Sequence, residues 1–479
     1  MAEQSLKDKT AKGIFWGGIS NGLQQVLNLI FGIVLARILD VSDYGMVGML
    51  AIFSAIASSI QECGFTTALT NEKEIKHEDY NAVFWFSVIS GVIMYFILFF
   101  SAPLIADFYK TPELKNISRV LFLSFVFGGI GTAQYAYMFK TLMVKQQAKV
   151  NVLALFFSGI AGIVSTLMGF AYWGLITQSL IYVALSTLLR WYYSPWRPTL
   201  NFNFFPLKRM IGFSSKIFFS NIFLQISNNI FSVLLGKLYN ANQVGFYSQG
   251  QKWMGMGQLF IGSVINNVAQ PILVQVSNEK ERQKEVFRKM VRFGAFLSFP
   301  LMFGLAFVSK EFIIIAVGIK WEPAVPFLRA FCIWGAFAYL WILFNNLLMT
   351  YGKSNICMWV TISTCSLQML ALLIMLPYGI LSMLGAYIIA YFVGLFVQYY
   401  FVRKLISLSV FNLIKDISPY LLATFVSFAI VWFSINPIDN IYTLFISKIL
   451  LSGFIYCAIL WFGNSIIFKE SVQYIRKRR

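Results

Sequence analysis

Charged residues are scarce in this sequence. Only 12% of its 479 residues are Asp, Glu, Lys or Arg, whereas 58% are hydrophobic, and the mean hydropathy is +0.70. A soluble protein carries about a quarter charged residues. Water cannot solvate so apolar a surface, so this composition excludes a soluble globular protein and indicates an integral membrane protein.

Cysteine and histidine are also sparse, and their placement excludes several kinds of site. The five cysteines form no CxxC pair, so neither a disulfide framework nor a zinc site is indicated. The single histidine, His77, lies in a short charged segment where water can solvate it. A GxxxxGK[ST] motif, which would mark an ATP site, does not occur. We therefore expect no metal and no cofactor, and any energy coupling has to come from an ion gradient or from substrate flux.

Long apolar runs dominate what is present. A membrane-spanning helix needs about 20 mostly apolar residues, and the sequence has about fourteen runs of this kind. They span residues 13–36, 43–69, 82–106, 117–139, 150–169, 172–193, 211–236, 243–272, 289–308, 323–350, 355–377, 382–402, 413–435 and 441–467. The sequence therefore predicts an all-α polytopic membrane protein.

The positions of Lys and Arg predict how these helices are oriented. Most of the 38 basic residues fall on the side of the membrane that holds the N-terminus, and the densest cluster lies at residues 280–292. Cytoplasmic loops are enriched in Lys and Arg, so both termini are expected in the cytoplasm, which requires an even number of helices. The same rule accounts for the formal charge of +19 without a nucleic-acid partner.

The sequence repeats itself at an offset of 200 residues. Eight of the 26 residues from Ser20 to Gly45 are identical, without a gap, to those from Ser220 to Gly245. The two copies begin on the same side of the membrane, and parallel repeats place a pseudo-two-fold axis along the membrane normal. We therefore expect a six-helix lobe at residues 1–195, a second at 211–404, and an additional helix pair at 411–468.

Amide side chains recur along one face of the first helix in each copy. The spacing of i, i+4 and i+7 draws a single stripe along a helix. Buried amides need hydrogen-bond partners, so a stripe of this kind does not face lipid. It lines a watery pathway between the lobes, or it joins helices by hydrogen bonds. Its members, which are candidate substrate-binding residues, are Asn21, Gln25 and Asn28 in the first copy and Asn221, Gln225 and Asn228 in the second.

Charged residues inside apolar runs are the remaining site candidates, because such charges are costly in a membrane. Lys252 lies one turn after Gln249, where its ammonium group can pair with a phosphate. Arg329 lies near the start of its helix, and Lys448 can extend toward the membrane surface or contact a lipid headgroup. Glu62 is either a protonatable coupling site or the partner of a basic side chain.

Several motifs resemble one known family. They are Leu35-Ala36-Arg37-Ile38-Leu39, Ser42-Asp43-Tyr44-Gly45, Glu62-Cys63-Gly64-Phe65, Gly236-Lys237-Leu238, Val244-Gly245-Phe246-Tyr247-Ser248 and the stretch from Lys320 to Arg329. On these motifs the chain resembles the Wzx-like polysaccharide flippases of the polysaccharide transporter group. That group belongs to the MOP superfamily, together with the MATE exporters and the lipid II flippases.

This resemblance implies a function and a location. Members of the family carry undecaprenyl-pyrophosphate-linked oligosaccharides from the inner to the outer leaflet of the bacterial inner membrane, by alternating access between two lobes. The implied partners are the lipid-linked glycan, membrane lipids, and polysaccharide polymerase or assembly proteins. Relatives commonly have arginine where this chain has Gln249 and Lys252. The first departure removes a cavity charge and leaves Lys252 as the main candidate for holding the pyrophosphate.

Two other classes of protein compete with this interpretation. A MATE-like exporter of cationic drugs would present carboxylates or aromatic residues at its centre, whereas the only acidic residue well inside an apolar run of the N-terminal lobe is Glu62. A membrane enzyme such as a glycan polymerase would need a positioned acid, base or nucleophile, usually on a large outer loop. The loops of this sequence are short, so a transporter is expected rather than an enzyme.

Overall fold

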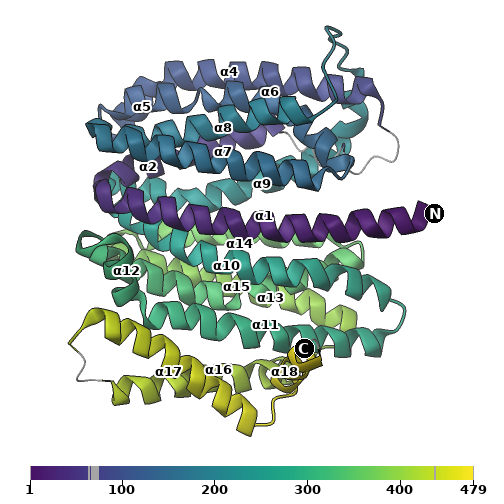
Figure 1. The fold of residues 1–479 in the computed structure, drawn as a ribbon, viewed down its shortest axis with the longest axis vertical. Helices are drawn as coiled ribbons and strands as arrows, with labels where there is room; N and C mark the ends of the chain where they lie inside the picture. Colours follow the sequence, from purple (N-terminus) through teal and green to yellow (C-terminus); the bar gives the residue numbers. More distant parts are fainter. Residues whose placement is uncertain (1, 63–64, 66–68, 70–74, 436–438, 478–479) are drawn as a thin grey trace. The chain divides into compact units, whose positions relative to one another are not determined.

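The computed structural model describes every residue except 1, 63–64, 66–68, 70–74, 436–438 and 478–479 (Figure 1). Among the described residues, side chains are also described except at 2–15, 62, 209, 211–217, 219–220, 267–268, 270–271, 471–472 and 474–477.

The chain folds into two compact units, Met1–Gly245 and Phe246–Arg479. The first contains α1 (Ala2–Ile38), α2 (Val41–Glu62), α4 (His77–Tyr109), α5 (Leu114–Leu121), α6 (Ser124–Lys140), α7 (Val144–Ser165), η1 (Thr166–Phe170), α8 (Trp173–Tyr193) and α9 (Phe205–Leu238). Helix α10 (Ala241–Gln275) begins in the first unit and continues into the second. The second unit then contains α11 (Lys280–Phe307), α12 (Ser309–Val317), η2 (Ile319–Ala324), α13 (Val325–Thr350), α14 (Ser354–Ile374), η3 (Leu376–Tyr378), α15 (Ile380–Ile406), α16 (Val410–Ser434), α17 (Ile441–Phe462) and α18 (Ile466–Lys477). The boundaries expected from the repeat differ from this division and stay a prediction.

The all-α prediction is confirmed, and every predicted apolar run contains helix. Eleven helical segments within the described residues are long and apolar enough to cross a membrane, so the count of fourteen stays a prediction. The run at 117–139 is two helices, α5 and α6. The two residues between them keep α-helical dihedral angles, and Leu114–Lys140 forms one segment long and apolar enough to cross a membrane. The short helices α12 and α18 follow predicted runs and are too short to span a bilayer.

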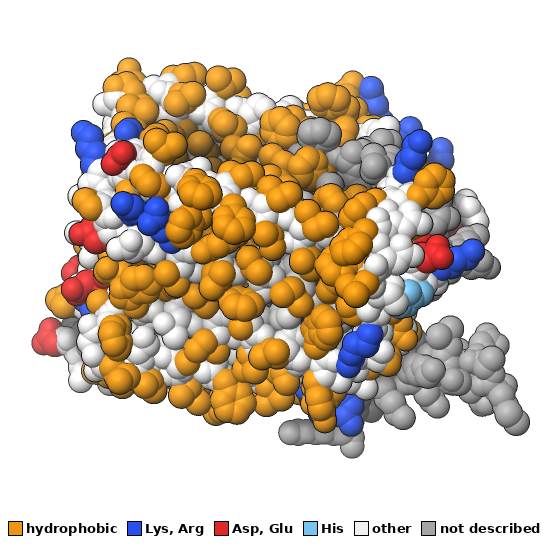
Figure 2. Space-filling view, turned by 90° about the horizontal axis from the view of Figure 1, so that it is seen from above, with side chains coloured by type: hydrophobic (Ala, Val, Ile, Leu, Met, Phe, Trp, Pro, Cys, Tyr) orange, Lys and Arg blue, Asp and Glu red, His pale blue; other side chains and the backbone are white. Residues whose placement is uncertain are grey.

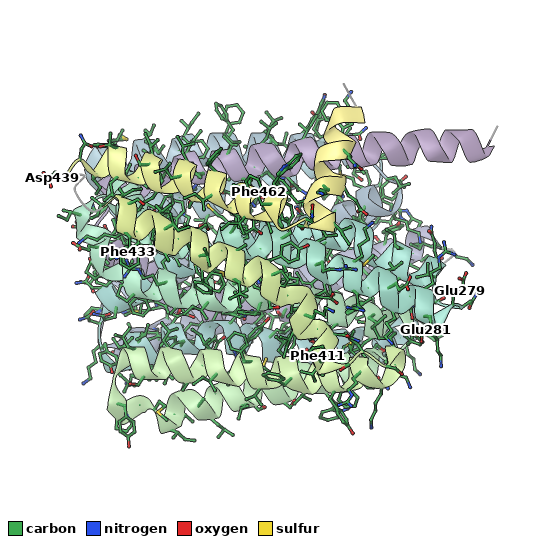
Figure 3. The ribbon with its side chains drawn as sticks, turned by 90° about the horizontal axis from the view of Figure 1, so that it is seen from below. Glu279, Glu281, Phe411, Phe433, Asp439 and Phe462 are labelled. Atoms are coloured by element: carbon green, nitrogen blue, oxygen red, sulfur yellow. The ribbon has the colours of Figure 1, made fainter. Side chains whose placement is uncertain are left out.

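Large apolar side chains cover much of the protein surface. Figure 2 shows hydrophobic side chains across the middle of the visible face and charged side chains gathered near its two lateral margins. In the second unit, Phe433 and Phe462 are 79% and 84% exposed. Figure 3 places them on α16 and α17, with Asp439 at one end of this unit and Glu279 at the other. An apolar band between charged margins is the surface that a lipid bilayer solvates, so the chain is a multi-pass membrane protein.

The 200-residue repeat has a counterpart in the structure. Helices α2 and α10 begin at Val41 and Ala241, which are equivalent positions of the repeat. A Cβ atom added to Gly45 would overlap the backbone oxygen of Ala241, and one added to Gly245 would overlap the backbone oxygen of Val41. The two helix starts therefore contact each other reciprocally, with a glycine of each resting on the backbone of the other. Such a contact is expected from two equivalent elements related by a pseudo-two-fold axis.

The segment after α8 is held against α4 by side-chain hydrogen bonds. Asn81 donates to the backbone oxygen of Asn201 at 2.6 Å and accepts from the backbone nitrogen of Thr199 at 2.9 Å. Trp85 donates through Nε1 to the Thr199 oxygen at 2.8 Å. These bonds satisfy backbone groups that no regular secondary structure would otherwise pair.

Candidate functional site

The amide-bearing face of α1 is open over one half of its length and covered over the other. Helical spacing places Asn21, Gln25 and Asn28 in line with Gly32 and Ala36. Asn21 and Asn28 are exposed and Gln25 is half-buried, whereas Gly32 and Ala36 are buried. The polar half of this face is therefore accessible, and the half made of small residues is packed.

Helix α9 repeats this pattern position by position. Asn221 and Asn228 are exposed and Gln225 is half-buried, and the same face continues into the buried residues Ser232 and Gly236. A Cβ atom on Gly236 would lie 2.9 Å from Met49 Cγ and from a ring carbon of Tyr109. Residues of α2 and α4 therefore cover this end of α9, and they leave its amide end uncovered.

The six amide side chains of these two stripes form no hydrogen bond with any other residue for which side chains are described. Amides beside the stripes do form such bonds. Gln24 donates to the hydroxyl of Ser20 at 2.9 Å, and Asn229 donates to the backbone oxygen of Gln225 at 2.8 Å. Amides left with open donors and acceptors need water or a ligand, since lipid supplies neither. The exposed amides of the two stripes are therefore available to water or to a ligand.

The covered end of α9 is fixed by a small set of contacts, which we term the α2–α4–α9 junction: Met49, Phe108, Tyr109, Gly236 and Lys237. Lys237 donates through Nζ to the backbone oxygen of Phe108 at 2.7 Å and lies 4.4 Å from the centre of its ring. Tyr109 donates its hydroxyl to the backbone oxygen of Met49 at 3.1 Å. The junction closes the end of α9 that is opposite the amides.

The two candidates on α10 differ in their surroundings. Lys252 is half-buried, and its Nζ lies 5.6 Å from the centre of the Trp253 ring. Gln249 is fully buried, and neither atom of its amide has a hydrogen-bond partner among the described residues. Gln249 therefore faces the protein interior in this conformation, whereas Lys252 is partly accessible.

The other charged candidates lie apart from the amide stripes in the sequence. Arg329 is exposed at the start of α13 and donates through Nε to the hydroxyl of Ser309 at 2.9 Å. Glu62 ends α2, and its side chain lies outside the described side chains. Lys448 is buried in an ion pair with Glu311, at 2.6 Å between Nζ and Oε1. This partner identifies the charge of Lys448 as part of the packing of α17 on α12, rather than as a group that extends to the membrane surface.

Sequence reasoning missed a group of amides in the second unit. Asn346 of α13 donates to Asn266 of α10 at 3.2 Å, and Gln398 of α15 donates to Asn345 of α13 at 2.7 Å. These bonds connect the three helices α10, α13 and α15 through polar side chains. The signal that could have found them is the Asn345-Asn346 pair inside an apolar run. Within the described residues, no group of three or more His, Cys, Asp or Glu is placed to hold a metal ion.

The fold defines a helical, multi-pass membrane protein with an internal sequence repeat. Residues 34–326 match the family described as "Polysaccharide biosynthesis protein", and the chain belongs to that family.

Relatives with assigned names match over most of the chain. The chain is 25% identical over 358 residues to the lipopolysaccharide biosynthesis protein WzxC of Escherichia coli (strain K12), covering 74% of this chain and 72% of the relative. It is 25% identical over 357 residues to the teichuronic acid biosynthesis protein TuaB of Bacillus subtilis (strain 168), covering 74% and 73%. The succinoglycan biosynthesis transport protein ExoT of Rhizobium meliloti (strain 1021) is 22% identical over 321 residues, covering 66% and 64%.

Solved structures share the fold at low sequence identity. The lipid II flippase MurJ, in an inward closed conformation, matches with a TM-score of 0.76 and 15% identity over 95% of this chain and 99% of its own. An inward-facing MATE multidrug resistance transporter of the MOP superfamily matches with a TM-score of 0.62 and 14% identity, over 81% and 96%. These similarities show that the chain shares its fold with these two proteins.

Proposed function

We propose that this protein flips undecaprenyl-pyrophosphate-linked oligosaccharides across the bacterial inner membrane, as a transporter and not as an enzyme. Its family and the names of its relatives, which cover lipopolysaccharide, teichuronic acid and succinoglycan biosynthesis, support a substrate for surface polysaccharide assembly. The fold shared with a lipid II flippase supports a substrate that joins a glycan to a polyprenyl lipid. Polysaccharide polymerase or assembly proteins are the further partners we propose.

The observation that carries this proposal is the one-sided covering of the amide faces on α1 and α9. Each face is open from its first to its third amide and buried one turn later. Unpartnered amides offer both donors and acceptors, which suits the hydroxyl groups of a sugar. Lys252 supplies a partly accessible positive charge that suits a pyrophosphate.

The distribution of Lys and Arg supports a cytoplasmic location for the open ends of both faces. The amides precede the buried residues in both helices, and the N-terminus is expected inside. The conformation is then open toward the leaflet where a lipid-linked glycan is loaded, and the α2–α4–α9 junction closes the opposite side. Alternating access requires this junction to open while the amide ends become covered. The lobes proposed to move are residues 1–195 and 211–404, with 411–468 as an additional pair.

The test is leaflet translocation of an undecaprenyl-pyrophosphate glycan in proteoliposomes at equal reconstitution. Asn228→Leu is compared with Asn229→Leu, which makes the same chemical change one residue away on a side chain that is already hydrogen-bonded. Losing hydrogen bonds to substrate lowers the rate about tenfold in the first variant and much less in the second. Lys252→Ala tests the phosphate contact in the same assay.

Each outcome has a defined meaning. Normal flipping by Lys252→Ala removes this residue as the anion site and leaves the transporter assignment in place. Equal losses in Asn228→Leu and Asn229→Leu contradict the amide-lined cavity. Absence of flipping by the wild type with several glycans, together with export of a cationic dye, contradicts the proposed function and supports a MATE-like exporter.

A further inference from the structure

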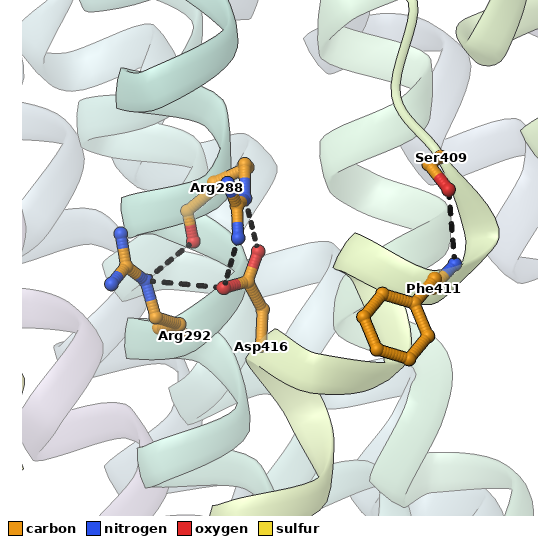
Figure 4. Close-up of polar contacts among 5 residues, drawn as sticks. All are labelled: Arg288, Arg292, Ser409, Phe411 and Asp416. Atoms are coloured by element: carbon orange, nitrogen blue, oxygen red, sulfur yellow. Dashed lines mark hydrogen bonds and ion pairs between the residues drawn. The ribbon is translucent and has the colours of Figure 1, made fainter.

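A buried carboxylate on α16 lies against two arginines of α11 (Figure 4). Asp416 is 4% exposed, and Arg288 bonds both of its oxygens, from Nε at 2.7 Å and from Nη2 at 3.0 Å. This is the two-pronged geometry in which a guanidinium best pairs with a carboxylate. Asp416 is thereby neutralised by a single arginine.

Arg292 lies one turn further along α11 and is held only through Nε. This atom is 3.6 Å from Asp416 Oδ1 and donates to the backbone oxygen of Arg288 at 3.4 Å. Its two Nη atoms form no hydrogen bond with another described residue, and Figure 4 shows them directed away from Asp416. The side chain is 30% exposed. Arg292 therefore shares Asp416 with Arg288 and presents the outer edge of its guanidinium.

The neighbouring charges do not remove this excess. Glu285 and Lys415 are both exposed, opposite in sign, and flank the cluster on α11 and α16. Lys289 is paired with Glu470 of α18 at 2.7 Å, and Lys284 with Glu281 at 3.7 Å. With these groups balanced, two arginines against one aspartate leave a net charge of about +1 at the site.

The surroundings of the site are those of a membrane surface. Phe411 and Ile414, on the turns of α16 just before Asp416, are 72% and 57% exposed. Arg292 lies inside the apolar segment of α11, since the next basic residue along the chain is Lys310. An arginine at this depth is costly unless an anion pairs with it. Asp416 is shared with Arg288, and phospholipid phosphates, which could pair with the second arginine, occupy the boundary between apolar and charged surface.

We propose that Arg288 and Arg292 bind the phosphodiester of an anionic phospholipid headgroup, with Arg292 donating from its Nη atoms. A phosphodiester carries one negative charge, which matches the net charge of the site, and its oxygens match the spacing of a guanidinium fork. A pyrophosphate carries more negative charge than the site can neutralise. The ligand is therefore a membrane phospholipid and not the glycan carrier, and this site does not depend on which substrate is transported.

The experiment measures phosphatidylglycerol retained by the purified full-length protein in detergent, by native mass spectrometry. Arg292→Gln removes the free guanidinium, and Arg282→Gln is the matched control, with the same charge change on the same helix in a 63% exposed side chain paired with Glu279. Loss of two charge-assisted hydrogen bonds lowers the apparent affinity of Arg292→Gln about tenfold or more, and that of Arg282→Gln much less. Arg292→Lys gives an intermediate loss because it keeps the charge and loses the fork.

A further variant, Asp416→Asn, distinguishes lipid binding at the two arginines from a purely structural role of the cluster. Asp416→Asn releases Arg288 from its carboxylate and raises the charge of the site, so more phosphatidylglycerol is retained. A site that only joins α11 to α16 would retain no more lipid in this variant. Undiminished binding by Arg292→Gln, or equal losses in Arg292→Gln and Arg282→Gln, overturns the proposal. Displacement of phosphatidylglycerol by equimolar undecaprenyl pyrophosphate overturns the assignment to a phospholipid.

Discussion

Replacing Lys448 by methionine removes one half of a buried ion pair and leaves Glu311 unneutralised. Both side chains are only 9% exposed, and the second oxygen of Glu311 has no hydrogen-bond partner among the described residues even in the wild type. Lys448 also lies 5.0 Å from the centre of the Phe307 ring and 5.7 Å from that of Trp432. The ammonium group is therefore the main source of stabilisation for this carboxylate.

The magnitude follows from the distance between the charges. At 2.6 Å and an effective dielectric constant of about 20, two unit charges attract by about 6 kcal/mol. Desolvation of each ion offsets several kcal/mol of this attraction, so the intact pair contributes little net stability. Removing one partner costs about 3–5 kcal/mol, because the other charge stays buried. For a unit of this size, that corresponds to a fall of about 10 °C in the melting temperature.

The assay is thermal unfolding of purified variants in one detergent, followed by the loss of the monomer peak in size-exclusion chromatography. Lys448→Met and Glu311→Gln are each measured alone and then combined. The combined variant is expected to regain most of the stability lost by Lys448→Met, because it removes the unpaired charge. If the two losses simply add, the pair is not energetically coupled, and the structural role assigned to Lys448 is incorrect.

Three further outcomes are expected. Gly245→Ala destabilises the protein by about 1–3 kcal/mol because its methyl group meets the backbone of Val41. The control is Gly255→Ala in the same helix, whose methyl group meets no atom within 4 Å and which stabilises the protein by about 0.5–1 kcal/mol. Equal effects of the two variants in thermal unfolding would contradict the reciprocal contact. Asn81→Ala loses two hydrogen bonds, worth about 2 kcal/mol in all. Limited proteolysis should therefore cleave residues 194–203 faster than in the wild type. An unchanged cleavage rate would show that these bonds do not hold the segment against α4. Tyr351 donates to Gln283 at 2.5 Å, and burial raises the pKa of Tyr351 above the usual 10.0, so the folded state favours the protonated phenol. The stability advantage of the wild type over Tyr351→Phe should therefore shrink as the pH rises above 10.0. A constant difference in stability would argue against this linkage.

The fold class could be predicted from composition and from the spacing of apolar runs, because a lipid-solvated surface leaves few alternatives to helices. The repeat could be predicted from identities that include Asn and Gln, which unrelated apolar helices seldom share in register. The short interruption between α5 and α6 could not, since no glycine or proline marks it in the sequence. The partner of Lys448 was also hidden, because Glu311 lies 137 residues earlier in the chain.

The candidate site was only partly accessible to sequence reasoning. Helical phase identified the faces of α1 and α9 and the residues that share them. It could not show that the face of α9 is covered at one end, because that depends on α2 and α4 packing against α9. Nor could it distinguish the buried Gln249 from the half-buried Lys252, which are less than one turn apart. The roles of all these residues in binding stay predictions.

The reciprocal contact between Gly45 and Gly245 also bears on how far the two copies can diverge. Contacts between interlocking side chains tie the identity of each residue to that of its partner, so both have to change together. A contact between backbone atoms requires only that no side chain intervenes. The copies can therefore differ at most positions, as eight identities in 26 residues show, while both keep the glycine at this contact. The glycine shared by the two copies therefore reflects the space available at the contact and not a need for matching side chains.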